Sequence, residues 1–401
     1  MFADKLSTRT HFVGTSEIRE VLKVTEKPEV ISFAGGLPAP ELFPVEDIKV
    51  ACDAILTESG VEALQYSTTE GYTPLRQAIV TRLKKMGIDT TVDHLLMISG
   101  SQQGLDLTGK LLLNEQDTVI CESPTYLAAI NAFKVYNASF VEVETDEDGM
   151  NMEKLEKALQ TNPQAKFIYT IPDFQNPTGR TLSLSRRKKM VALANQYNVL
   201  IVEDNPYGAI RFAGEPLPPI KHFDTEERVI YLSTFSKIFS PGLRLGWICA
   251  HEDFIKQYVA FKQAADLHTD SFAQRITAKY IELFDLDAHI EKIKAVYHHR
   301  RQTMIDCIDR FFPKQVTHSS PEGGLFIWVE LPESVNSREV FEVCIQNDVA
   351  FVPGQAFFPN LKKENTFRLN YSNMPDRKII EGMRRLGQVL HSFLNSNVAN
   401  F

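Results

Sequence analysis

The strongest constraint on the fold is a repeated alternation of short apolar, β-rich runs with helical stretches through the middle of the chain. The strand-like runs are 94–99, 117–122, 166–172, 199–203, 228–233 and 246–250, and the helical stretches include 101–113, 125–134 and 184–197. Alternating β and α units of this kind predict a mostly parallel sheet covered by helices. Run 246–250 comes too soon after Arg244 to be reached through a crossover helix. We therefore expect this run to be antiparallel to its neighbour.

The length and the later part of the chain predict a second, smaller domain. A chain of 401 residues exceeds what one hydrophobic core usually supports. After about residue 285 the pattern changes to a long charged helix, short strand-like runs at 324–329 and 367–369, and an amphipathic terminal helix. We expect a large domain over 46–285, a smaller α+β domain over 286–401, and a segment 1–45 that packs on the small domain and the substrate site.

One lysine lies among small hydroxyl residues in the run Ser233-Thr-Phe-Ser-Lys-Ile-Phe-Ser-Pro-Gly-Leu-Arg244. A lysine amine can form an imine with a carbonyl cofactor such as pyridoxal 5′-phosphate (PLP), while hydroxyls, a turn glycine and a guanidinium can hold the cofactor's phosphate. A surface loop with an ordinary lysine would also account for this run. Three further motifs favour the cofactor site.

Two polar side chains follow predicted strands at their carboxyl ends, where open α/β sheets bind ligands. Asn176, in Asn-Pro-Thr-Gly, follows the run 166–172, and its amide can donate to the phenolic oxygen of the cofactor. Asp204 follows the apolar run that begins at residue 199. A carboxylate facing the pyridine nitrogen at ~4 Å in a partly dry site contributes roughly 4 kcal/mol and keeps the ring protonated, as an electron sink. An ordinary turn and a solvated or helix-capping carboxylate are the alternatives.

The third motif is Ser99-Gly100-Ser101-Gln102-Gln103-Gly104, between a predicted strand and a predicted helix. A glycine and a serine at a helix start offer free N–H groups and a positive dipole end to a phosphate. Serine is also a common N-cap, so the motif is weak by itself. It is neither a dinucleotide fingerprint nor a Walker-type loop.

Taken in order, the phosphate turn, Asn176, Asp204, Tyr207, Lys237 and Arg244 resemble those of the fold-type I PLP-dependent aminotransferases. The resemblance covers nearly the whole chain. The segments 32–44, 64–72, 101–107 and 265–269 are similar to those of the 2-aminoadipate and kynurenine/aminoadipate aminotransferases. It implies an α/β, PLP-dependent transferase-like fold with a mostly parallel seven-stranded sheet in the large domain.

The resemblance also implies a role for each matching residue. Lys237 would bind the cofactor covalently and move the proton at the substrate α-carbon, and Asp204 and Tyr207 would complete the catalytic set. Asp204 would pair with the pyridinium nitrogen, and Asn176 and Tyr207 would bind the phenolic oxygen. The remaining cofactor contacts would be Ser101, the Gln102 backbone, Ser236 and Arg244 on the phosphate, Tyr66 reaching the phosphate from the other subunit, and Tyr126 stacked on the ring.

For the substrate, the best candidate is Arg368, which interrupts an alternating strand-like stretch. A guanidinium can grip a carboxylate with two hydrogen bonds, and the family places its α-carboxylate arginine here. Gly36 lacks a Cβ and would let backbone approach the substrate, and Asn176 would also contact the substrate. Arg19 matches the position where the aminoadipate enzymes bind a side-chain carboxylate. Arg368 and Arg19 could instead be solvent-facing residues of a strand and a helix.

These observations predict a homodimeric PLP-dependent aminotransferase that runs a ping-pong cycle, with 2-aminoadipate or aromatic and other hydrophobic amino acids as donors and 2-oxoglutarate as acceptor. A β-lyase or decarboxylase of the same fold would use the same lysine and acid. A non-enzymatic PLP-binding regulator would need a DNA-binding domain, and only some 30 residues precede the PLP region. The net charge of −8 argues against nucleic acid or anionic membrane as the main partner. Five scattered cysteines and the lack of a signal peptide or an 18-residue apolar run indicate a cytoplasmic protein with no metal site.

Overall fold

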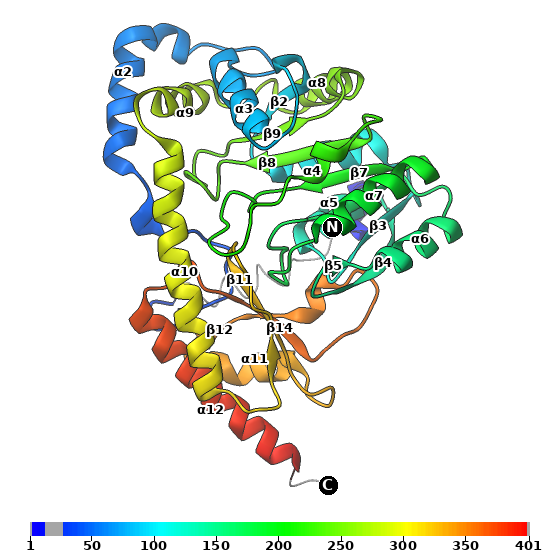
Figure 1. Ribbon diagram of the computed structural model, residues 1–401, viewed down its shortest axis with the longest axis vertical. Coiled ribbons are helices and arrows are strands. Elements are labelled where there is room, and N and C mark those ends of the chain that lie inside the picture. Colours follow the sequence, from blue (N-terminus) through cyan, green and yellow to red (C-terminus); the bar gives the residue numbers. More distant parts are fainter. Residues whose placement is uncertain (1, 13–26, 399–401) are drawn as a thin grey trace.

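The computed structural model describes residues 2–12 and 27–398, and its centre is a sheet of eight strands with helices on both faces (Figure 1). The strand order is β2-β9-β8-β7-β6-β3-β4-β5. The strands are β2 (Leu95–Ile98), β3 (Thr118–Ser123), β4 (Ser139–Asp146), β5 (Gly149–Met150), β6 (Phe167–Thr170), β7 (Leu200–Asp204), β8 (Val229–Thr234) and β9 (Gly246–Cys249).

Five consecutive strands of this sheet, β4, β3, β6, β7 and β8, are parallel to one another. Strand β9 is antiparallel to both β8 and β2, which confirms the expectation for the run 246–250. The predicted number of seven strands is wrong, because the chain turns back after β4 and adds the two-residue strand β5 antiparallel to it. No strand was predicted over 139–146, because this strand is rich in acidic residues and largely exposed or half-buried.

The central strands are buried on both faces, and their alternate side chains belong to two separate hydrophobic clusters. Phe167 and Tyr169 of β6 pack with residues of α4 and α5, whereas Ile168 packs on the opposite face with residues of α6 and α7. This double burial explains the continuous apolar runs in the sequence. The helices of this part are α2 (Val45–Ala63), α3 (Thr73–Lys85), α4 (Ser101–Leu112), α5 (Leu127–Lys134), α6 (Met152–Thr161), α7 (Leu184–Tyr197), α8 (Glu252–Asp266) and α9 (Ser271–Leu283).

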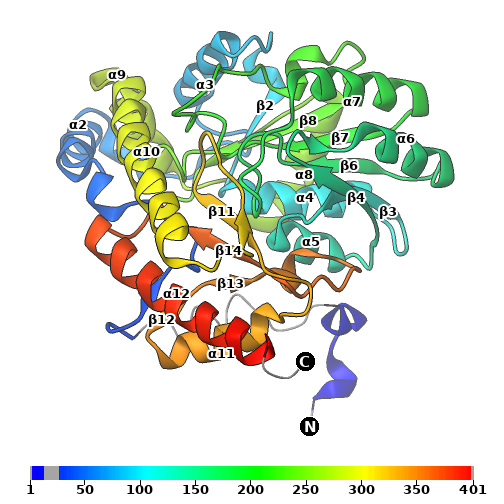
Figure 2. The ribbon, with the colours of Figure 1, turned by 60° about the horizontal axis from the view of Figure 1, so that its bottom comes forward.

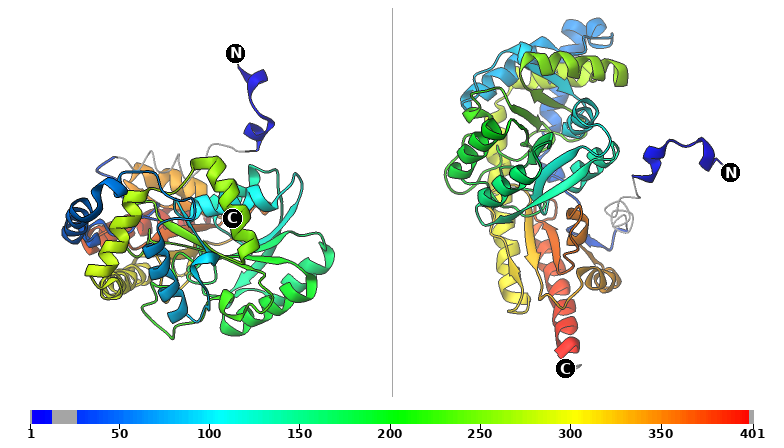
Figure 3. Two further views of the ribbon diagram at one scale, coloured as in Figure 1. Left: turned by 90° about the horizontal axis from the view of Figure 1, so that it is seen from above. Right: turned by 90° about the vertical axis from the view of Figure 1, so that its right-hand side faces the viewer.

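A second sheet of four antiparallel strands lies below the first in Figures 1 and 2, with the order β10-β11-β14-β13. Its helix α10 runs beside both parts of the molecule, as the side view of Figure 3 shows. The elements are α10 (Leu286–Phe311), β10 (Thr317–His318), β11 (Phe326–Glu330), α11 (Ser337–Gln346), β12 (Val349–Ala350), β13 (Val352–Pro353), β14 (Thr366–Asn370) and α12 (Asp376–Val398).

The segment before α2 lies against this second part. Strand β1 (Ile31–Ser32) pairs in parallel with β12, and the amide of Asn370 donates to the carbonyl of Phe33. The chain then passes between the two sheets on its way to α2. Short 3₁₀ turns complete the description, at Ala3–Lys5, Thr8–His11, Pro40–Leu42, Val92–His94, Ile220–Phe223 and Gly354–Phe357. Within the described ranges, every helix falls short of the length and apolar character that a membrane span requires.

Candidate active site

A cavity of about 350 Å³ lies at the carboxyl ends of the parallel strands, between the large sheet and the small one. This is within the usual size of small-molecule sites. Residues from both sheets line it, together with the segment after β1. The structure brings the following predicted site residues to this cavity: Gly36, Ser101, Gln102, Tyr126, Asn176, Asp204, Tyr207, Ser236, Lys237, Arg244 and Arg368.

Asp204, the last residue of β7, contributes a buried carboxylate to the cavity wall. Its Oδ2 accepts a hydrogen bond of 2.9 Å from the hydroxyl of Tyr169. No donor among the described residues reaches Oδ1. Burial raises the pKa of Asp204 to about 7, and the hydrogen bond from Tyr169 acts in the opposite direction. A buried carboxylate oxygen without a partner is costly, so this atom fits a ligand that brings an N–H group.

Lys237 follows β8, and its amine donates to the carbonyl oxygen of Gly36 at 2.8 Å. Burial, together with the positive charges of Arg368 and Arg244, lowers the pKa of Lys237 to about 8. Some of this amine is therefore unprotonated near neutral pH, and the unprotonated share increases as the pH rises through about 8. A neutral amine is the form that attacks a carbonyl carbon and the form that accepts a proton.

The other end of the cavity has the groups that an anion requires. Helix α4 begins at Ser101 without a side-chain cap, so the N–H groups of Ser101 and Gln102 can bind an anion, whereas that of Gln103 donates to the carbonyl of Gly100. Arg244 lies over this turn and donates to the carbonyl of Ser99 at 3.3 Å. Gly100 has a φ of +79°, and a Cβ there would lie 2.6 Å from Nη2 of Arg244, so only glycine leaves room for the guanidinium. With the hydroxyl of Ser236, these groups form a cradle for a phosphate.

Arg368 on β14 is 2% exposed, so the alternative of a solvent-facing arginine is wrong. Its Nη1 donates to Oδ1 of Asn176 at 2.7 Å and its Nη2 to the carbonyl of Ala34 at 2.6 Å. The guanidinium carbon lies 4.2 Å from the ring centroid of Phe326. Burial lowers the pKa of Arg368 to about 10, which leaves the side chain charged at neutral pH. The cavity wall therefore includes a fixed cation that suits a carboxylate.

Two tyrosines, the half-buried Tyr126 and the buried Tyr207, complete the cavity wall. Tyr126 is the residue before α5, and burial raises its pKa to about 12. Burial also raises the pKa of Tyr207, whose ring packs edge-on against Phe326 with centroids 6.0 Å apart. Both hydroxyls stay protonated at neutral pH, so both can donate hydrogen bonds to a ligand.

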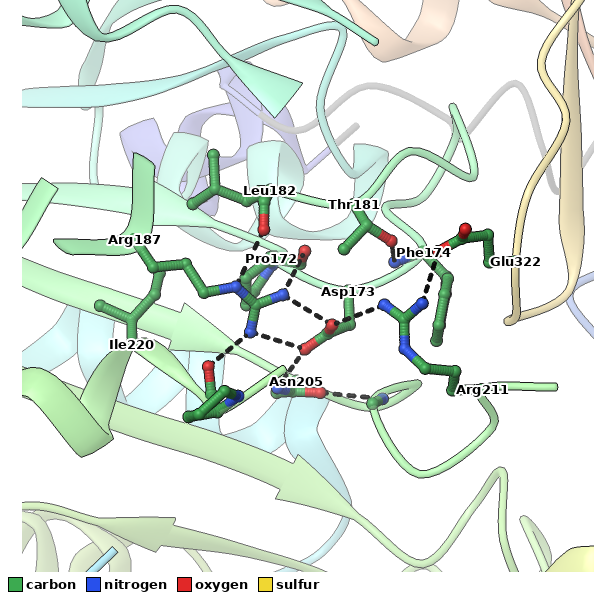
Figure 4. Close-up of polar contacts among 12 residues, drawn as sticks. Pro172, Asp173, Phe174, Thr181, Leu182, Arg187, Asn205, Arg211, Ile220 and Glu322 are labelled. Carbon is green, nitrogen blue, oxygen red and sulfur yellow. Dashed lines mark hydrogen bonds and ion pairs between the residues drawn. The ribbon is translucent and has the colours of Figure 1, made fainter. Parts of the chain in front are cut away.

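A buried network of charged and amide groups joins the loop that carries Asn176 to the end of β7, which carries Asp204 (Figure 4). The carboxylate of Asp173 accepts from Nη2 of Arg187 at 2.7 Å and from Nδ2 of Asn205 at 3.0 Å. Asn205 directly follows Asp204, and Asp173 lies three residues before Asn176. The carboxylate of Asp173 therefore ties the loop after β6 to the residue that follows β7.

The same network reaches the second sheet through Arg211, which Figure 4 shows between Asp173 and Glu322. Arg211 forms an ion pair of 2.6 Å with Glu322 and a β-bridge with Gly323. The amide of Gly324 donates to the carbonyl of Ile210. These contacts fix the start of β11 relative to the large sheet. They therefore also fix the position of the Phe326 ring.

One predicted residue that the structure describes, Tyr66, does not line the cavity. Tyr66 is 78% exposed and packs edge-on against His268, with ring centroids 5.9 Å apart. Tyr66 therefore does not contribute to the cavity of its own subunit. Arg19 lies outside the described residues.

The sequence interpretation missed two residues that act on this site. Tyr169 bonds to Asp204 from the neighbouring strand, and Phe326 packs against both Tyr207 and Arg368. Each lies in a run that was predicted as a strand, but an aromatic residue in a strand carries no local signal of its partner. Only the pairing of strands and the stacking of the two sheets bring these contacts about.

The residues present fit PLP. They provide an amine of lowered pKa, a buried carboxylate oxygen without a partner, and a phosphate cradle that depends on Gly100. The fold and this site define a PLP-dependent aminotransferase of fold type I. The chain belongs to the aminotransferase class I and II family, whose model matches residues 30–386.

Relatives that are named as aminotransferases cover nearly all of the chain. An aromatic-amino-acid aminotransferase of Thermococcus litoralis is 47% identical over 94% of this chain and 91% of its own length. A 2-aminoadipate transaminase of Thermus thermophilus is 40% identical over 95% of both chains. The structure of a kynurenine aminotransferase of Pyrococcus horikoshii, solved in complex with PMP, is 41% identical, covers 97% of both chains and superposes with a TM-score of 0.94. These findings confirm the predicted fold class, activity and cofactor.

Proposed function

We propose that this enzyme transfers the amino group of 2-aminoadipate, or of aromatic and other hydrophobic amino acids, to a 2-oxo acid such as 2-oxoglutarate. The amine would pass through the cofactor in a ping-pong cycle, so that both half-reactions use one site. The main support is that Lys237, Asp204 and Arg368, from three separate parts of the chain, share one cavity. The names of the relatives support the choice of donors.

The cofactor would be held at each of its polar groups. PLP, when bound, supplies an electron-withdrawing ring that stabilises negative charge at the substrate α-carbon. Asp204 would take the ring N–H with its free Oδ1, and Tyr126 would pack on the ring face. The phenolic oxygen would accept from Asn176 and Tyr207, and the phosphate would be bound by Ser101, the Gln102 backbone, Ser236 and Arg244.

Lys237 would be the base that takes the proton from the substrate α-carbon and delivers it to C4′ of the cofactor. A pKa of about 8 suits this role, because the amine can both accept and give up a proton near neutral pH. Arg368 would bind the α-carboxylate and so orient the α-carbon toward the amine. Gly36 would let the chain approach the substrate closely.

A broad substrate range would suit the relatives' names, which include aromatic and 2-aminoadipate donors. We propose that Arg19 binds the side-chain carboxylate of 2-aminoadipate. One pocket would then accept acidic and hydrophobic donors, with modest discrimination between them.

We also propose a homodimer with shared active sites, in which the partner subunit's Tyr66 reaches the phosphate. Large apolar side chains at the end of α2 and just after it support this, since Val61, Leu64 and Tyr66 are 82%, 74% and 78% exposed. We further propose a cytoplasmic enzyme of amino-acid biosynthesis, with a large domain over 46–285 and a small one over 286–401.

The visible spectrum of the purified enzyme tests the proposed reaction. 2-Aminoadipate, phenylalanine and leucine are added separately, and 2-oxoglutarate is added last. We expect a yellow absorption band that bleaches with a donor and returns with the oxo acid. A band that no donor bleaches, or turnover that does not depend on an oxo acid, would contradict an aminotransferase with these substrates and favour a lyase or decarboxylase.

A further inference from the structure

We propose that Tyr169 is a positioning residue for the cofactor's ring nitrogen: its hydroxyl holds Asp204 in the orientation and the charge state that let Oδ1 accept the ring N–H. This inference rests on the proposed role of Asp204. Tyr169 does not line the cavity, so it acts through the carboxylate rather than by touching the cofactor.

The register of two parallel strands brings the two side chains together. Tyr169 on β6 is paired with Val202 on β7, and Asp204 lies two residues beyond Val202. Side chains two residues apart in a strand point to the same face, so the carboxylate and the phenol share one face of the sheet. The diagonal separation between them is within reach of a long aromatic side chain, and the hydroxyl lies 2.9 Å from Oδ2.

The phenol ring is held in place from its other side. Tyr169 is 1% exposed, and its ring packs edge-on against Phe133 of α5, with centroids 5.7 Å apart. Phe133 packs in turn on Phe167, two residues before Tyr169. The hydroxyl therefore has one direction available, toward Asp204. Its bond fixes Oδ2 and leaves Oδ1 as the oxygen without a partner in the described chain.

The bond also favours the charged form of Asp204. The carboxylate is 1% exposed, and burial alone favours its neutral form. Tyr169 is the donor that opposes this effect. A neutral Asp204 could still touch the ring nitrogen, but it would no longer attract a protonated ring. The interaction that depends on Tyr169 is therefore specific to the nitrogen atom of the cofactor.

The test compares two cofactors on the full-length enzyme after removal of bound PLP. One is PLP, and the other is its 1-deaza analogue, in which carbon replaces the ring nitrogen. Dissociation constants are measured by absorbance titration for the wild type, Tyr169→Phe, Asp204→Asn and the double variant. Tyr258→Phe is the matched control. Tyr258 is also fully buried, and its hydroxyl lies 2.8 Å from the hydroxyl of Thr108 on α4. Neither residue lines the cavity.

We expect Tyr169→Phe to raise the Kd for PLP by about 10- to 100-fold, the usual worth of a hydrogen bond to a charged group. The Kd for the deaza analogue stays unchanged. Tyr258→Phe changes neither constant. The double variant binds PLP no more weakly than Asp204→Asn alone, because the tyrosine acts only through the carboxylate.

The outcomes separate the inference from the proposed role of Asp204. If Asp204→Asn keeps the wild-type preference for PLP over the deaza analogue, Asp204 is not the partner of the ring nitrogen and both proposals fail. If Asp204→Asn loses that preference and Tyr169→Phe keeps it, the role of Asp204 stands and the inference about Tyr169 is overturned. Equal weakening of both cofactors by Tyr169→Phe would also overturn it, since that result marks a purely structural residue.

Discussion

The buried carboxylate of Asp173 provides a stringent test of the network that joins the site loops (Figure 4). In its ion pair with Arg187, the side chains are 6% and 0% exposed, and the two groups lie 2.7 Å apart. Asp173→Asn keeps the shape and removes the charge, so the guanidinium of Arg187 stays buried without its counter-ion. Removing one partner of such a pair costs about 3–5 kcal/mol.

The matched control is Glu322→Gln, at the outer end of the same network. Glu322 pairs with Arg211 at 2.6 Å, but its side chain is 53% exposed. Arg211 keeps its bond to the carbonyl of Ala213 when the carboxylate is lost. An exposed pair of this kind contributes about 0–1 kcal/mol. The two isosteric substitutions should therefore differ by about 2 kcal/mol or more in the free energy of unfolding.

The assay is urea-induced unfolding of the PLP-saturated enzyme, followed by fluorescence and circular dichroism, with the transition midpoint and slope compared for the three proteins. We expect a large shift of the midpoint for Asp173→Asn and a small one for Glu322→Gln. Losses that are equal and below about 1 kcal/mol would refute the reasoning. They would show that the bonds from Arg187 to the carbonyls of Leu182, Pro172 and Pro218 are enough to hold its charge.

Four further outcomes are expected. Because burial lowers the pKa of Lys237 to about 8, the rate at which cofactor-free enzyme takes up PLP rises from about pH 7 to about pH 9 and then levels off; a rise confined to about pH 10 and above contradicts this. Arg368→Lys lowers kcat/KM about 100-fold for every donor, since an ammonium cannot bind a carboxylate with a planar fork; an unchanged value for all donors would rule out the carboxylate role. Arg19→Ala lowers the rate with 2-aminoadipate more than that with leucine or phenylalanine, and an equal loss on all donors would make Arg19 structural. Mixing Lys237→Ala with Tyr66→Ala chains restores activity if each cavity uses the partner's Tyr66, because one hybrid site is then intact; no gain on mixing places Tyr66 elsewhere.

The parts of the site that the sequence predicted are those carried by single segments. Lys237, Asn176, Asp204 and Arg244 each lie in a short motif whose flanking residues indicate a strand end or a turn. The alternation of apolar runs and helices predicted the layers of the large sheet in the same way. Each of these signals is local, so one sequence is enough to detect it.

The parts that could not be predicted depend on contacts between distant segments. The burial of Arg368 is one such feature: its alternating strand looks like a surface strand, so the resemblance to the family pointed to this residue, and the side chain is buried because the second sheet stacks on the carboxyl ends of the first. Tyr169 acquires its partner through the register of β6 and β7. Strand β4 was missed for a different reason: it lies near one edge of the sheet, is largely exposed or half-buried, and lacks the apolar run that marks its neighbours.

The hydrogen bonds that Lys237 and Arg368 make to the carbonyls of Gly36 and Ala34 have a consequence for turnover. Before a ligand binds, each of these two side chains already donates a hydrogen bond to a backbone carbonyl oxygen. A ligand that reaches these groups therefore replaces one oxygen with another, and its affinity reflects only the difference between the two bonds. When a product leaves, the two carbonyl oxygens are already in position to accept hydrogen bonds from Lys237 and Arg368 again. Because one hydrogen bond replaces another, neither product is held much more tightly than the free site holds itself together. This favours the release of two products from one cavity.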